Sequence, residues 1–221
     1  MTLRFLLPFI AATLLSGGSL IVEASQPKRP NVPLKATVSP KKPTVAPTKA
    51  PVSPKKPAVS QPVQPKWQLF TAPDGRFSVL MPGMPTRDIQ TQKTYMGEID
   101  LQIFSAQPPQ QEVAYLVVYN EFPHSYAQMT NPQEILNNVR DMALKTTKSN
   151  LISQRNIRSS NGHPGKEFAY INTGGKITRT RVYVAEGRLY QVMAITTKKQ
   201  QKTLAKTITG YLNSFQIVLK K

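Results

Sequence analysis

Hydrophobic and polar residues alternate in short runs throughout residues 67–221. Runs with strand-like spacing cover 67–71, 77–81, 91–95, 98–106, 113–121, 151–157, 166–171, 177–185 and 188–196. Turn-forming residues separate many of them, among them Pro73-Asp74-Gly75, Met96-Gly97, Gly174-Gly175 and Glu186-Gly187. The pattern predicts a mostly antiparallel sheet whose strands are joined by hairpins.

Two segments have helical spacing instead. The first opens at Asn131-Pro132, where asparagine is a good N-cap and proline suits the first turn. Its apolar residues are Ile135, Leu136, Val139, Met142 and Ala143. The second helix is predicted over 200–215, with Leu204, Ile208, Tyr211, Leu212 and Phe215 on one side.

The last predicted hairpin, 177–196, is apolar on both faces. Val182, Val184, Leu189 and Met193 share one face, and Tyr183, Ala185, Tyr190, Val192 and Ala194 share the other. An antiparallel sheet with one solvated face alternates polar and apolar residues more cleanly. We therefore predict an α+β protein, an α/β/α sandwich with a central mostly antiparallel sheet and a helix on each face.

The amino-terminal residues differ from the rest. A charged start at 1–4 is followed by an apolar run at 5–15 and by small residues that suit cleavage before Ser25. This predicts a signal peptide at 1–24. The alternative is an uncleaved membrane anchor over 5–22. In both cases the remainder is exported, to the periplasm, the thylakoid lumen or the extracellular space.

Residues 25–66 form a basic Pro/Lys-rich linker. The segment has no acidic residue, no aromatic residue before Trp67, and the repeated sequence VSPKKP at 38–43 and 52–57. Such a composition cannot bury a core, so we predict a disordered, partly polyproline II segment followed by one domain at 67–221.

The charge of the chain points to an anionic partner. It has 29 Lys and Arg against 11 Asp and Glu, a formal net charge of +18. Lys41, Lys42, Lys55 and Lys56 are candidates for contacting anionic wall polymer or a membrane surface. Nucleic acid is not an expected partner of an exported chain. The alternative is that these lysines only keep the linker soluble and extended.

Residues suited to catalysis are few. The absence of cysteine excludes disulfides, a lipid-modified amino-terminal cysteine and thiol chemistry. The two histidines, His124 and His163, lie in predicted turns and are interpreted as surface residues. Glu98 and Asp100 share a strand face, which is a candidate cation site or, alternatively, a solvated face. No catalytic motif is present, so we predict a non-enzymatic protein without cofactor or metal.

Basic residues suggest a binding patch within the domain. Arg179 and Arg181 point the same way from one predicted strand. Lys166 or Tyr170 lies beside them, depending on the register, and Arg155 and Arg158 belong to a neighbouring strand. The patch Arg155, Arg158, Lys166, Arg179 and Arg181 would suit an acidic protein or a lipid head group. The alternative is the charged end of an otherwise buried sheet.

Short motifs along the domain resemble the PsbP-like family. They are DGRFSV at 74–79, PGMP at 82–85, GHPGKE at 162–167, RVY at 181–183, RLY at 188–190 and SFQI at 214–217. The resemblance covers 67–221 and is closest to the small exported domains of cyanobacteria, not to the photosystem II subunit itself. It implies the same α/β/α sandwich. We interpret 82–85 as a signature of the fold and not as a ligand-binding loop.

The resemblance also implies a non-catalytic role. The best known member is an extrinsic lumenal subunit that helps photosystem II retain its inorganic cofactors, and others are assembly factors. The basic linker departs from that subunit. Our leading hypothesis is an exported binding or assembly module for a protein complex, associated with a photosystem or the cell envelope. The alternative is a structural envelope protein whose Lys/Pro tail binds wall polymer or a membrane surface.

Overall fold

The structure is a computed structural model that describes residues 65–94, 97–109, 111–123 and 131–219, all within one compact unit. The predicted signal peptide at 1–24 lies outside the described residues. So does the linker at 25–66 with its four candidate lysines, apart from Pro65 and Lys66. Met96 of the first predicted hairpin turn and His124 also lie outside them.

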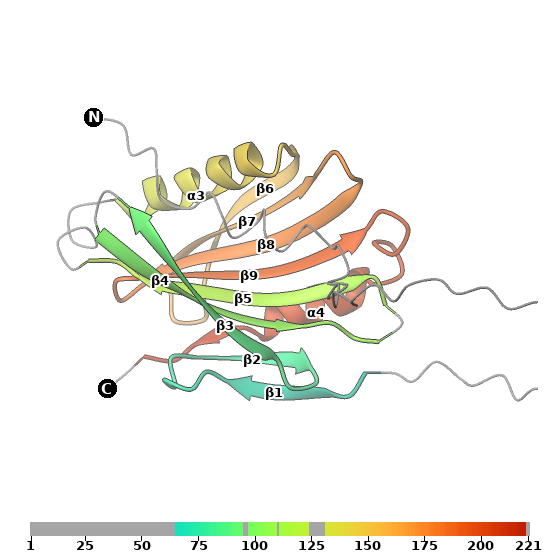
Figure 1. Cartoon of the computed structure of the whole chain (residues 1–221), viewed down its shortest axis with the longest axis horizontal. Coiled ribbons are helices and arrows are strands. Elements are labelled where there is room, and N and C mark those ends of the chain that lie inside the picture. Colours follow the sequence, from blue (N-terminus) through green and yellow to red (C-terminus); the bar gives the residue numbers. More distant parts are fainter. Residues whose placement is uncertain (1–64, 95–96, 110, 124–130, 220–221) are drawn as a thin grey trace, which may run out of the picture. The chain divides into compact units, whose positions relative to one another are not determined.

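Seven antiparallel strands form the main sheet (Figure 1). They are β3 (Thr86–Thr94), β4 (Gly97–Ala106), β5 (Val113–Glu121), β6 (Asn150–Arg158), β7 (Pro164–Ile171), β8 (Lys176–Ala185) and β9 (Arg188–Thr197). Their order is β3-β4-β5-β9-β8-β7-β6. The prediction of hairpin-connected antiparallel strands is confirmed, although β3 begins five residues earlier than predicted.

A second, smaller sheet was not predicted. It contains β1 (Trp67–Thr71), β2 (Phe77–Pro82) and β10 (Gln216–Ile217), in the order β1-β2-β10. Asp74 and Gly75 make the turn between β1 and β2, where Gly75 has a φ of 71° and the Arg76 amide donates to Asp74 Oδ1 (3.1 Å). The predicted turn thus joins the first two strands of the small sheet. Its third strand, β10, is too short to show a hydrophobic pattern in the sequence.

Two helices complete the described fold. At the start of α3 (Pro132–Thr146), the Asn131 side chain accepts a hydrogen bond from the Gln133 amide (2.8 Å), as the N-cap prediction requires. The last helix, α4 (Ala205–Ser214), begins five residues later than predicted. Residues 200–204 form turns instead, because the amides of Gln200 and Gln201 both donate to the carbonyl oxygen of Thr197.

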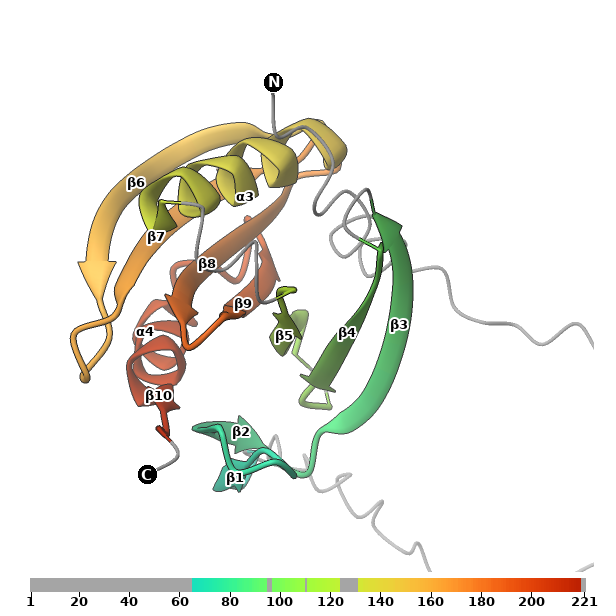
Figure 2. The ribbon, with the colours of Figure 1, turned by 90° about the vertical axis from the view of Figure 1, so that its left-hand side faces the viewer.

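Two hydrophobic clusters make up the core. In one, Ile135, Leu136 and Val139 of α3 pack with residues from β4, β5, β7, β8 and β9. In the other, Ile208, Tyr211 and Leu212 of α4 pack with aromatic residues of β4, β5, β8 and β9 and with Phe77, Val79 and Met81 of β2. Figure 2 shows α3 along β7 and β8, and β1 and β2 below the large sheet. The predicted sandwich lacked this second sheet and so describes the layers only in part.

Candidate functional site

The predicted basic patch is partly assembled, around one carboxylate. Glu167 on β7 faces Arg155 on β6 and Arg181 on β8 in the strand register. Arg181 Nε donates to Glu167 Oε2 at 2.6 Å and Arg155 Nη2 donates to the same oxygen at 3.1 Å. Arg179 Nη2 lies 3.8 Å from Glu167 Oε1. Three guanidinium groups therefore share one carboxylate, and the arrangement keeps an excess of positive charge.

The carboxylate of Glu167 is held in its charged form. Burial alone would raise its pKa, but hydrogen bonds from Arg155 and Arg181 outweigh burial and lower the pKa below its ordinary value. Arg181 and Arg179 also reach α4. Arg181 donates to the carbonyl of Leu212 (3.0 Å) and Arg179 to Thr209 Oγ1 (3.1 Å). These two arginines thus attach α4 to the sheet, while Arg155, with 63% of its side chain exposed, faces solvent.

Lys166 and Arg158 lie apart from this cluster. Lys166 pairs with Val182 and points to the face opposite Glu167, where its Nζ donates to Asn156 Oδ1 at 2.8 Å. Only 5% of Lys166 is exposed, and burial, followed by repulsion from Arg140, lowers its pKa. Arg158 donates to the carbonyl of Gly162 (2.7 Å) in the β6–β7 turn. The structure therefore brings together three of the five predicted residues.

A second charged network joins two of the motifs noted in the sequence. Asp74, from the DGRFSV motif, accepts hydrogen bonds from Arg188 Nη1 (2.7 Å), in the RLY motif, and from the Tyr119 hydroxyl (3.0 Å). Arg188 also binds Glu121, and Arg76 pairs with Glu186. The network fastens the β1–β2 turn to the end of β5 and to the β8–β9 hairpin. Sequence reasoning assigned Asp74 to turn geometry alone and missed the partner.

Burial and this network determine two pKa shifts. For Asp74, burial alone would raise the pKa, but hydrogen bonds from the Arg76 amide, Arg188 and Tyr119 lower it overall. For Tyr119, burial and then the hydrogen bond to Asp74 raise the pKa to about 12. The Arg188 guanidinium carbon lies 5.4 Å from the centre of the Tyr119 ring, a cation–π contact. The lowered pKa keeps Asp74 charged for its ion pair with Arg188, and the raised pKa keeps the Tyr119 hydroxyl protonated as a donor to Asp74.

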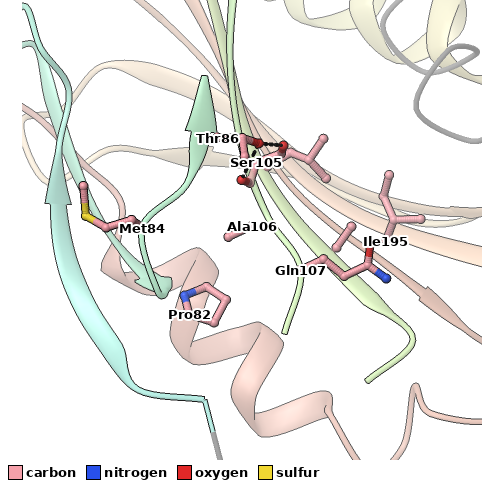
Figure 3. A pocket seen from close by; sticks show the side chains of 9 residues that line it. Pro82, Met84, Thr86, Ser105, Ala106, Gln107 and Ile195 are labelled. Atoms are coloured by element: carbon pink, nitrogen blue, oxygen red, sulfur yellow. Dashed lines mark hydrogen bonds between the residues drawn. The ribbon is translucent and has the colours of Figure 1, made fainter. Parts of the chain in front are cut away.

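A pocket of about 460 Å³ opens where β2 leads into β3 (Figure 3). It is lined by Pro82, Met84, Thr86, Ser105, Ala106, Gln107, Ala114, Leu116 and Ile195. Thr86 Oγ1 contacts the Ser105 carbonyl oxygen at 3.2 Å and the Ser105 hydroxyl at 2.9 Å, and so ties the start of β3 to the end of β4. None of these nine lining residues is charged, so the pocket suits an uncharged and largely apolar group.

The pocket depends on the stretch that was interpreted only as a fold signature. Gly83 has a φ of 97°, a left-handed conformation that glycine adopts at little cost. The chain turns there, and Met84 is left with 78% of its surface exposed. Thr86 begins β3, and the remaining lining residues come from the end of β4 and the residue after it, from β5, and from β9, which is distant in sequence. The sequence offered one signal for this place, a methionine set between Pro82-Gly83 and Pro85.

Two further predictions concern single residues. His163 lies in the β6–β7 turn, as predicted, but it is half-buried and not on the surface, and its Nε2 is buried without a hydrogen-bond partner. Asp100 is exposed and accepts a hydrogen bond from Thr91 (2.6 Å). In the described parts of the chain, no three His, Cys, Asp or Glu residues gather in a way that could hold a metal ion. The described helices include none that is long and apolar enough to cross a membrane.

Comparison with known proteins identifies the fold. No family model and no curated protein matches the chain. Among solved structures, cyanobacterial PsbP (CyanoP) from Synechocystis sp. PCC 6803 is similar, with a TM-score of 0.50 and 11% identity, over 70% of this chain and 94% of that one. The chain therefore has a PsbP-like fold, as the motifs indicated.

A second solved structure is more distant. It is a Pseudomonas aeruginosa protein of unknown function, with a TM-score of 0.37 and 11% identity, over 70% of this chain and 98% of that one.

Proposed function

We propose that the chain is an exported, non-enzymatic binding or assembly module, in which the pocket lined by Pro82, Met84 and Ile195 holds an apolar side chain of a partner protein. Export would depend on the signal segment at 1–24, and the basic linker would serve as the tether. The proposal includes the finer α/β/α arrangement, with α3 and α4 as outer layers on opposite faces of the large sheet.

The observation that carries this proposal is the chemistry of the pocket. Its volume, about 460 Å³, falls in the range of sites that hold small ligands or a large side chain. Leu116, Ile195, Pro82 and Met84 offer apolar surface, and Gln107 offers a neutral amide that can donate and accept. Such a lining selects its occupant by shape and by the apolar surface that it can bury, which suits binding of an apolar side chain of a partner protein.

The rim of the pocket favours an extended peptide as the occupant. Thr86, which lines the pocket, is the first residue of β3, and β3 is an edge strand that, among the described strands, pairs only with β4. The outer edge of such a strand presents amide and carbonyl groups to which an added strand can bind, with side chains entering neighbouring pockets. A partner segment lying along β3 would thus place one apolar residue between Met84 and Ile195.

Site-specific photo-crosslinking in the producing cells tests this proposal. A photoreactive phenylalanine replaces Met84 at the rim, and a control replaces Ile152, which is 50% exposed on β6 at the opposite edge of the sheet. Crosslinking from position 84 should yield one discrete adduct that position 152 does not yield.

A second variant asks whether the pocket itself is used. Ala114→Leu, introduced into the chain that carries the crosslinker at position 84, fills the pocket and should abolish the adduct. Ala205→Leu, an identical change at an exposed position of α4, should leave the adduct intact. Circular dichroism checks that both variants are folded. An adduct that persists when the pocket is filled would show that the pocket does not hold the partner.

A further inference from the structure

Six lysines gather at one end of the large sheet. Lys145 and Lys148 lie at the end of α3, and Lys198, Lys199, Lys202 and Lys206 lie between the end of β9 and the first turn of α4. The strand register explains why these segments meet. Asn150, at the start of β6, pairs with Ile171, and Lys176 after the next turn pairs with Thr197 at the end of β9. We refer to these six residues as the lysine end (right-hand side of Figure 1).

The lysine end is not neutralised within the described residues. All six side chains are exposed, and none forms an ion pair with another described residue. Of the two acidic residues nearby, Asp141 pairs with Arg140 (2.7 Å), and Glu112 accepts from Thr197 Oγ1 (3.0 Å), which leaves one carboxylate charge beside six lysines. The positive charge is therefore available to a partner.

At the opposite end of the sheet, positive and negative side chains neutralise one another. There Asp74, Glu121 and Glu186 face Arg76 and Arg188 in ion pairs. The arginines of the fold thus stabilise internal contacts, while the lysines of the lysine end remain solvated. Such a separation produces a field that orients the molecule toward an anionic surface, lysine end first.

The start of the domain and an exposed apolar side chain lie at this same end. Trp67, at the start of β1, pairs with Pro82, and its ring lies 5.1 Å from the ring of Tyr115. Tyr115 in turn pairs with Ala194, near the end of β9. The described part of the chain therefore begins at this end of the sheet. Met84, 78% exposed, follows Pro82 by two residues.

We propose that the lysine end, together with Met84, is a docking surface for an anionic lipid bilayer. Lysine is a flexible, hydrated point charge and suits a diffuse array of head groups, whereas arginine suits fixed bidentate partners. An exposed methionine beside the lysines can enter the boundary between head groups and acyl chains. A hydrated wall polymer offers no such apolar layer, so Met84 distinguishes the two kinds of surface. The docking surface goes beyond the proposed function and shares one residue with it, Met84, which also lines the pocket.

The test measures binding of the full chain to vesicles. Vesicles of phosphatidylcholine with 30% phosphatidylglycerol are compared with pure phosphatidylcholine by co-sedimentation at low and high salt. Each lysine near such a surface strengthens binding by roughly fivefold, so the double change Lys198→Gln and Lys199→Gln should weaken it about 25-fold. The control is Arg158→Gln, which removes a charge at the other end of β6, outside the arginine cluster, and should change binding less than threefold, whereas Lys199→Gln alone should weaken it about fivefold.

Soluble polyglutamate serves as a second probe and separates lipid from polymer. Met84→Gln should weaken binding to the anionic vesicles severalfold and leave binding to polyglutamate unchanged. Unaltered vesicle binding by the double lysine variant would overturn the proposal. So would equal vesicle binding by Met84→Gln and the unmodified chain, because the surface would then recognise any polyanion.

Discussion

Gly165 on β7 is the position where one added methyl group tests the packing most directly. A Cβ at this position would lie 2.5 Å from Tyr183 Cδ1 and 2.7 Å from the carbonyl oxygen of Val182. Gly165 is not among the residues with positive φ, so the glycine is needed for space and not for its backbone conformation. This accounts for the second glycine of the GHPGKE motif in the sequence.

Neither neighbour of Gly165 can easily move. Val182 O belongs to the backbone of β8, which pairs with β7 on one side and β9 on the other, and the Tyr183 ring is buried and stacked on Phe215 at 5.7 Å. Overpacking of this kind costs about 1–3 kcal/mol. The smaller entropy of the unfolded chain offsets part of it, by about 0.4–1 kcal/mol. Because the Cβ contacts would be shorter than 3.0 Å, the cost lies near the upper end of that range, and we expect Gly165→Ala to lower the free energy of unfolding by about 2 kcal/mol.

The assay is urea unfolding followed by circular dichroism, with thermal unfolding beside it. For a domain of this size, about 2 kcal/mol corresponds to a fall in Tm of roughly 4–8 °C. The matched control is Gly210→Ala in α4, where an added Cβ meets nothing within 4 Å. That change should raise stability by about 0.5–1 kcal/mol, because alanine is the better helix former. If Gly165→Ala were as stable as the unmodified chain, the close approach of β7 and β8 would be refuted.

Three further predictions concern the charged groups. Arg181→Met should lower the free energy of unfolding by about 2–3 kcal/mol, measured in urea, because Arg181 bridges Glu167 and the end of α4; Arg155→Met, at the exposed partner of the same carboxylate, should cost less than about 1 kcal/mol. The pKa values of Asp74 and Glu167 lie below their ordinary 3.8 and 4.5, so these charged carboxylates add to the free energy of unfolding above those pH values. That stabilisation is lost as the pH falls through the folded-state pKa values. The urea midpoint should therefore fall on acidification, and it should fall less in Asp74→Asn. The raised pKa of Tyr119, about 12, means that the stability it adds is present below pH 10 and is lost toward pH 12; tyrosinate absorbance should show one fewer late-titrating group in Tyr119→Phe.

The elements that could be predicted are those whose residues carry both alternation and turn signals. β1 and β5 have the predicted bounds, and the hairpin at Glu186-Gly187 joins β8 and β9 as expected. Asn131 caps α3 through its side chain. In each case the signal is local, since a strand face, a turn or a cap depends on residues within a few positions of one another.

The features that could not be predicted depend on distant partners or on weak patterns. β10 is two residues long and exists because it pairs with β2. The first half of β3 is exposed, so no apolar alternation marks it. The candidate site was only partly foreseen for the same reason. Arg155, Arg179 and Arg181 meet as the face rule suggested, but their shared carboxylate on Glu167 follows from the register. The pocket needs four separate segments.

The small sheet has a consequence for the order in which the chain can fold. β2 pairs with β1, at the start of the described chain, and with β10, near its end. Phe215, 5.5 Å from the ring of Phe77, completes the packing around β2. Synthesis proceeds from the amino terminus, so this closure waits until residues 215–217 have left the ribosome. Until then the domain lacks part of its core, and such a delay would suit the proposed export if the chain crosses a membrane unfolded.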